Sequence, residues 1–187
     1  IRELDIVKSY EADGLANIAN NPGHLRMYKE TESWLKEVSA EQFRTLPEFG
    51  FEGSLTPAAY QLYAETVKAA LDSKYSARIN GKVLITSYVA DNWKPAQIQE
   101  LLSRLRKDFG DKFLFVPDIS VNLYRQAQTY QGAQGKMPEK SDKEFRNVLQ
   151  EYLNVCDGLY FASYPKFRSG DKDYTVQFYS DFSDKYL

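Results

Sequence analysis

The sequence contains a single cysteine and a single histidine among its 187 residues, and it carries no excess of positive charge. Cys156 alone can form neither an internal disulfide nor a metal site with several cysteine ligands. Because 24 Lys and Arg face 26 Asp and Glu, the formal net charge is -2, and little counterion release would favour binding to a phosphate backbone. We therefore expect no nucleic-acid partner.

Long apolar runs are also missing from the sequence. No run approaches the roughly 20 residues needed to cross a bilayer, so we expect no membrane span. Residues 1–10 form a charged amphipathic stretch that is typical of a helix rather than of a signal peptide. We expect any export signal to lie outside this chain.

The glycine-rich and nucleophile motifs of several enzyme classes are absent as well. The sequence has no Gly-x-Gly-x-x-Gly, no phosphate loop ending in Gly-Lys-Ser/Thr and no Gly-x-Ser-x-Gly elbow. Nucleotide binding and serine hydrolysis therefore have no support. Asp171 and Asp173 resemble the start of a calcium loop, but the glycine and the terminal glutamate of that loop do not follow. We expect neither a metal nor a cofactor.

Aromatic residues, in contrast, are plentiful. The chain has 14 Tyr, 11 Phe and 2 Trp, which together make up 14% of its residues. Such rings pack in a core, and those with a polar tip also stack on flat ligand faces such as sugars. The aromatic content is therefore consistent with a carbohydrate ligand, but core packing also explains it.

The strongest pattern is an amphipathic helix, a short junction that often contains glycine, and a short apolar strand, and it occurs five times. Thr56 before Pro57 predicts an N-cap followed by proline at the first helical position. Pro47 should weaken the second half of its strand, since proline cannot donate a ladder hydrogen bond. The predicted strands cover residues 15–19, 43–49, 82–88, 112–117 and 159–164.

A long polar segment interrupts this alternation of helix and strand, and a predicted helix then continues it. Residues 120–140 are polar, rich in glutamine, and longer than the usual loop of about 4 to 6 residues, as in many binding lids. Ser141 and Glu144 then form a capping-box pattern, which predicts that the next helix starts at this serine. Both features lie before the last predicted strand.

Asp13-Gly14 and Asp157-Gly158 both join a predicted helix to a predicted strand, as expected where strands run parallel. We predict one α/β domain over residues 1–187, either a parallel (β/α) barrel of TIM type or an open doubly wound sheet. The missing glycine-rich loops weigh against the open sheet. A complete barrel takes about 250 residues, so we expect this barrel to be incomplete in the chain as given.

In both architectures a functional site lies at the carboxyl ends of the strands. Carboxylates, amides and aromatic rings follow the predicted strands there, and these groups suit the binding and cleavage of a carbohydrate. The candidates for catalysis are Asp118, Asp91 and Glu48, and those for substrate binding are Asn17, Asn20, Tyr88, Trp93 and Tyr164.

Each candidate also has a structural interpretation. Asp91 is equally suited to capping the helix that Pro95 opens, and a solvated position beside Pro47 is the favoured interpretation of Glu48. Asp118 is the best catalytic candidate, because a carboxylate at the end of a buried strand requires a partner or a ligand. Trp93 and Tyr88 are expected on the rim above their strand, where a short loop leaves the indole little room to enter the core.

Other polar residues are assigned to the fold. We expect Asp13 and Asp157 to act in turns, His24 to be structural or exposed, and Cys156 to be a buried packing residue.

Several segments resemble, in order and spacing, the barrel of glycoside hydrolase family 71, whose members are α-1,3-glucanases. These are residues 63–77, the strand Gly81-Lys82-Val83-Leu84-Ile85-Thr86-Ser87-Tyr88, the strand Phe113-Leu114-Phe115-Val116-Pro117-Asp118, and Cys156-Asp157-Gly158-Leu159-Tyr160. Asp13-Gly14-Leu15-Ala16-Asn17-Ile18 is similar to a further strand of that family. The likeness runs over most of the chain, and the neighbouring endo-α-mannosidase-like family 99 shares some of these strings.

The resemblance implies an inverting hydrolase of α-linked glucan or a related polysaccharide, secreted or in the cell envelope. One departure stands out, because the family's acidic Trp-Asn-Asp-Tyr-Gly-Glu-Ser string has no counterpart here. Either the chain stops before that motif or the protein is an inactive or divergent relative. The alternatives are therefore a carbohydrate-binding protein without catalysis, and an interaction domain whose glutamine-rich loop binds protein.

Overall fold

The computed structural model describes residues 14–37, 41–51, 53–119 and 139–160, together with the short segments 168–169 and 172–173. The helix expected in residues 1–10, most of the polar segment 120–140, Asp171 and Tyr164 lie outside these ranges. Within β1, the side chains of residues 17–19 also lie outside the description.

Helices and strands alternate along the chain, so the predicted α/β class with a parallel sheet is confirmed. The elements are β1 (Gly14–Ala19), α2 (Pro22–Glu37), β2 (Arg44–Gly50), α3 (Pro57–Asp72), β3 (Arg78–Ile79), β4 (Lys82–Tyr88), the 3-10 turn η1 (Ala90–Asn92), α4 (Pro95–Phe109), β5 (Phe113–Pro117), α6 (Glu139–Leu153), β6 (Arg168–Ser169) and β7 (Lys172–Asp173).

Local signals explain where most of the helices begin and end. Thr56 Oγ1 accepts a hydrogen bond from the Ala59 backbone N–H at 3.1 Å, which confirms the predicted N-cap of α3. Gly110 follows α4 with a φ of 72°, a left-handed conformation that glycine adopts at little cost. The expected start of α6 is wrong, because this helix begins at Glu139 and Ser141 lies inside its first turn.

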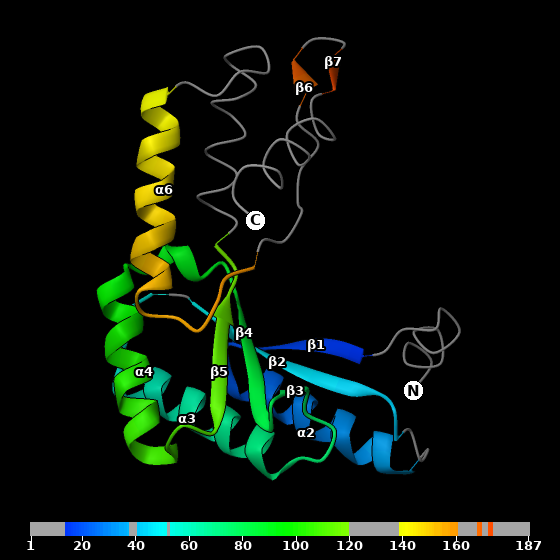
Figure 1. Ribbon diagram of the computed structural model, residues 1–187. Coiled ribbons are helices and arrows are strands. Elements are labelled where there is room, and N and C mark those ends of the chain that lie inside the picture. The colour runs from blue at the N-terminus through cyan, green and yellow to red at the C-terminus, as the bar shows by residue number, and fades with distance from the viewer. Residues whose placement is uncertain are drawn as a thin grey trace.

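The main sheet has its parallel strands in the order of the chain. β1 pairs with β2, β2 with β4, and β4 with β5, and a parallel bridge between Asp118 and Tyr160 continues the series. The short β3 forms an antiparallel hairpin with the start of β4. Helices α2, α3 and α4 lie together on one side of this sheet (Figure 1). Each successive βα unit is therefore placed beside the previous one.

Pro47 lies in the middle of β2, so the prediction that it weakens the second half of the strand is wrong. On the β4 side, Thr45 bonds to the segment around Ser76, whereas pairing with β4 starts only at Glu48. Pro47 falls between these two stretches of pairing, where β2 changes neighbour. The missing N–H of proline is tolerated at this point because the ladder is interrupted there.

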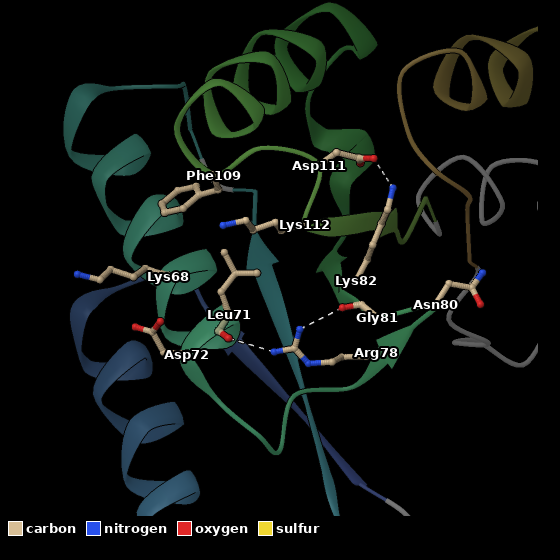
Figure 2. A pocket seen from close by; sticks show the side chains of 10 residues that line it. All are labelled: Lys68, Leu71, Asp72, Arg78, Asn80, Gly81, Lys82, Phe109, Asp111 and Lys112. Carbon is tan, nitrogen blue, oxygen red and sulfur yellow. Dashed lines mark hydrogen bonds and ion pairs between the residues drawn. The ribbon is translucent and has the colours of Figure 1, made fainter.

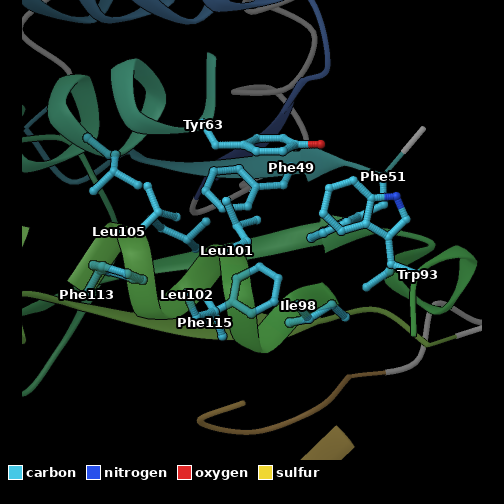
Figure 3. Packing of buried hydrophobic residues seen from close by; sticks show 14 of the residues in the cluster. Phe49, Phe51, Tyr63, Trp93, Ile98, Leu101, Leu102, Leu105, Phe113 and Phe115 are labelled. Atoms are coloured by element: carbon cyan, nitrogen blue, oxygen red, sulfur yellow. The ribbon is translucent and has the colours of Figure 1, made fainter. Parts of the chain in front are cut away.

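The main core lies between the sheet and the helices. β2, β4 and β5 contribute alternate residues to it, and α3 and α4 contribute one face each, as expected from the periodicities of strands and helices. Figure 3 shows the aromatic centre of this core. Its fully buried members include Phe49, Phe51, Val83, Ile85, Phe113 and Phe115 from the strand segments and Val67, Ile98, Leu101 and Leu105 from the helices.

Trp93 belongs to this core, so its expected placement on the rim is wrong. Its side chain is 1% exposed, and its ring meets the Phe51 ring edge-to-face at a centroid distance of 4.7 Å (Figure 3). The Tyr152 hydroxyl from α6 donates to the Trp93 carbonyl oxygen at 2.8 Å. The short loop before Pro95 turns the indole inward, where packing with aromatic neighbours stabilises it.

The opposite face of the sheet is less covered. Along β2, β4 and β5 the residues between the core positions are mostly half-buried, among them Leu46, Leu84, Leu114 and Val116. None of the helices in the described part of the chain is long and apolar enough to cross a membrane.

Candidate functional site

A cluster of polar side chains lies on the face of the sheet that turns away from the helices. Glu48 is opposite Thr86 in the register of β2 and β4, so the two side chains stand side by side. Glu48 Oε1 accepts hydrogen bonds from the Tyr160 hydroxyl at 3.1 Å and from Thr86 Oγ1 at 3.4 Å. Together with Asp118, these residues form what we call the Glu48 cluster.

Asp118 directly follows β5 and is fully buried. Its backbone N–H donates to Ser87 Oγ at 3.2 Å, and its carbonyl oxygen accepts from the Ala90 N–H at 2.8 Å. On the other side, the Tyr160 N–H donates to the Pro117 carbonyl oxygen at 3.0 Å. The backbone of Asp118 is thus held between the end of β4 and the segment at Tyr160.

The environment of Glu48 shifts the pKa of its carboxyl group. The pKa of Glu48 is raised above its ordinary value, first because burial penalises the charged form, and further because the negative charge of Asp118 lies nearby. The hydrogen bonds from Tyr160 and Thr86 stabilise the carboxylate and oppose this rise. Glu48 therefore keeps its proton to a higher pH than an ordinary glutamate, which is the property required of a general acid.

Asp91, the third catalytic candidate, lies in the 3-10 turn η1 and is half-buried. Val89, which comes between β4 and this turn, has a φ of 44°, a left-handed conformation that a β-branched residue rarely adopts. The chain changes direction at Val89, so Asp91 belongs to the turn and not to β4.

Two of the predicted binding residues meet at the carboxyl edge of the sheet. Tyr88 is 40% exposed and lies opposite Gly50 in the register of β2 and β4. Asn20 follows β1 and approaches Gly50 so closely that a Cβ on this glycine would lie 2.3 Å from the Asn20 Cβ. Gly50 therefore leaves room for Asn20, and the edge runs from Asn20 over Gly50 to Tyr88.

The other predicted binding residues are Trp93, Tyr164 and Asn17. Trp93 is buried in the core, Tyr164 lies outside the described residues, and the structure describes only the backbone of Asn17, which pairs with Pro47.

Sequence reasoning missed Tyr160 and Thr86. Thr86 carries a usable signal, because the period of two along β4 puts it on the same face as Tyr88. No comparable signal exists for Tyr160, whose hydrogen bond to Glu48 joins residues 112 positions apart.

Of the residues assigned to the fold, Asp157, Cys156 and His24 are described, whereas Asp13 lies outside the described residues. Asp157 accepts from the Arg106 guanidinium at 2.8 Å and from the Phe115 backbone N–H at 2.8 Å, so it ties α4 to β5. Burial raises the pKa of the Cys156 thiol to about 12, as expected for a packing residue rather than a nucleophile. The His24 backbone N–H donates to Asn21 Oδ1 at 3.0 Å, at the start of α2.

The protein is thus of the α/β class, and it carries two carboxylates, Glu48 and Asp118, toward the carboxyl edge of a parallel sheet. Comparisons with known protein families, with curated proteins and with solved structures found no match to this chain. The function of the protein is therefore inferred from the Glu48 cluster and from the resemblance of the sequence to glycoside hydrolase family 71.

Proposed function

We propose that this protein is a carbohydrate-active β/α-barrel protein that hydrolyses an α-linked glucan or a related polysaccharide. The observation that carries the proposal is Glu48, whose raised pKa goes with a second carboxylate, Asp118, beside it. A pair of neighbouring carboxyl groups is what the cleavage of a glycosidic bond requires, and the raised pKa of Glu48 suits this residue to the role of general acid. The resemblance to family 71 supplies the substrate class.

The barrel part of the proposal is supported by the order of the strands. A doubly wound sheet reverses its strand order at a switch point and carries helices on both faces. Here β1, β2, β4 and β5 follow one another, and α2, α3 and α4 share one side (Figure 1). A series of this kind is typical of a β/α barrel, in which the face away from the helices becomes the interior.

In the proposed reaction Glu48 is the general acid that gives its proton to the glycosidic oxygen. Asp118 is the base that activates water, and Tyr160 orients Glu48 through its hydroxyl hydrogen bond. Asn20 and Tyr88 bind sugar hydroxyls or a sugar face at the rim. Inversion, which the resemblance implies, would need the two carboxyl groups about 6.5 to 9.5 Å apart on opposite sides of the substrate.

Hydrolysis assays test the proposal directly. We expect release of reducing ends from α-1,3-glucan, α-mannan or starch, with the anomer of the first product determined by NMR. Glu48→Gln and Asp118→Asn should each lower kcat/KM about 10² to 10⁴-fold, since each removes a proton-transfer group.

Two matched variants are the controls. Glu37→Gln on the exposed end of α2 should keep full activity, and Asp91→Asn should keep most of it if the pair is Glu48 and Asp118. Saturable oligosaccharide binding without turnover would instead support the non-catalytic carbohydrate-binding alternative. Neither binding nor turnover with any of the three polysaccharides would overturn the carbohydrate proposal.

A further inference from the structure

A hollow of about 750 Å³ lies at the amino ends of β4 and β5, at the opposite end of these strands from the Glu48 cluster. Its walls come from the end of α3, the turn between β3 and β4, and the loop from α4 to β5. This volume falls within the range of pockets that hold small organic ligands, about 300 to 1,000 Å³. The hollow is therefore large enough for more than a single ion.

The lining of this hollow is positive in a chain that is negative as a whole. Lys68, Arg78, Lys82 and Lys112 face only two carboxylates, Asp72 and Asp111, whereas the formal net charge of the protein is -2. The Lys82 ammonium pairs with Asp111 Oδ2 at 2.5 Å, so these two charges compensate each other.

The other three cations are not compensated in this way. Lys68, Arg78 and Lys112 form no ion pair within residues 14–37, 41–51, 53–119 and 139–160, the main ranges that the structure describes. They come from three different elements and line one hollow. An anion entering it would gain attraction from several sides at once.

Arg78 is held in place by the backbone. Its guanidinium donates to the carbonyl oxygens of Leu71 at 3.0 Å and Gly81 at 3.2 Å (Figure 2). It also donates to the Ser73 carbonyl oxygen at 3.2 Å. These bonds leave part of the five N–H donors of the guanidinium available. Because the side chain is already ordered, binding an oxyanion would cost little further conformational entropy.

We propose that this hollow binds the phosphate group of a small ligand. Arg78 and Lys112 contact the phosphate oxygens, since guanidinium and ammonium groups form strong charge-assisted hydrogen bonds with phosphate. Leu71 and Phe109 provide an apolar wall for the organic part of the ligand (Figure 2). The site is separate from the Glu48 cluster, so this proposal does not depend on glycoside hydrolysis.

Titration calorimetry with the full chain tests this site with three probes: inorganic phosphate, a hexose phosphate and the unphosphorylated hexose. We expect saturable binding of the hexose phosphate that weakens as salt is added, and no binding of the hexose. Equal affinity for inorganic phosphate would assign the site to the free ion, and tighter binding of the hexose phosphate would assign it to an organic phosphate.

Charge variants localise the binding. Lys112→Gln should weaken it about fivefold to tenfold, and Lys68→Gln should weaken it less. Lys36→Gln, which makes the same charge change on the exposed end of α2, should have no effect. No binding of either phosphate probe, or equal weakening in Lys112→Gln and Lys36→Gln, would overturn the proposal.

Discussion

Single side chains decide the chemistry of the sheet edge, and Glu48 is the most informative of them. Its pKa is raised by burial and by the charge of Asp118, so the folded protein binds the Glu48 proton more tightly than the unfolded chain does. The stability that this proton contributes is complete below the ordinary pKa of 4.5 and is lost as the pH rises through the raised value.

Replacing Glu48 with glutamine should therefore change how the stability of the protein depends on pH. The free energy of unfolding of the native chain should decline between pH 4.5 and the raised pKa of Glu48, and this part of the decline should be missing in the variant. Urea unfolding at several pH values measures the difference. Parallel pH profiles for the two proteins would contradict the assignment.

Trp93 gives a second prediction for a single side chain. Because its indole is 1% exposed and packs on Phe51, Trp93→Ala should cost about 3 to 5 kcal/mol of unfolding free energy. Trp34, which is half-buried on α2, offers the matched comparison, and Trp34→Ala should cost clearly less. The opposite order of the two losses in denaturant unfolding would place Trp93 outside the core.

The fate of Trp93 also shows where prediction from sequence stops for single residues. The position of Asp118 at a strand end could be predicted, because a carboxylate that directly follows an apolar run is visible in the linear sequence. The direction of Trp93 and the contact of Tyr160 with Glu48 depend on tertiary packing between distant segments, which local spacing does not contain.

At the scale of elements, local sequence signals predict several of the helix boundaries. Thr56, Pro57 and Gly110 mark helix ends through local backbone chemistry, and the structure agrees with them. The predictions made from Pro47 and Ser141 were wrong for a common reason, which is that the surrounding structure overrode a local signal. A proline is harmless where its strand changes partner, and a capping pattern is overridden when the helix continues before it.

The contact of Asp157 with two elements leads to a prediction at this scale. Asp157→Ala removes the acceptor of the Phe115 N–H and the partner of Arg106, so it should cost about 1 to 3 kcal/mol. Arg106→Ala should cost only about 0 to 1 kcal/mol, since that ion pair is partly exposed to solvent.

Asp157→Asn separates these two contributions. The asparagine keeps an oxygen that can accept from Phe115 while losing the charge, so its loss of stability should resemble that of Arg106→Ala. Equal losses for Asp157→Asn and Asp157→Ala in thermal unfolding would show that the ion pair carries the effect.

For the whole molecule, the question is whether the parallel sheet closes. In a closed barrel no strand has a free edge, whereas an open sheet leaves one side of β1 without a neighbouring strand. Because β1 pairs with β2 alone among the described strands, we expect every second amide of β1 to exchange faster than the amides of β4, which lies between β2 and β5. Amides of β1 that all exchange as slowly as those of β4 would instead indicate a closed barrel. Hydrogen exchange followed by NMR measures both strands in one experiment.

Fast exchange at every second amide of β1, with slow exchange throughout β4, would be the pattern of an open sheet. The sequence could predict the class of this fold because each βα unit repeats a local pattern. Closure could not be predicted, because it depends on how the first and last strands of the sheet meet.

The consecutive order of the strands has a consequence for how the protein is made. Each strand pairs with the one that the ribosome released about one helix earlier, so no strand has to wait for a partner near the far end of the chain. Paired residues in neighbouring parallel strands are 30 to 38 positions apart, so each pairing closes within a single βα unit. The protein can thus assemble during translation, as each new βα unit docks on the edge left by the unit before it.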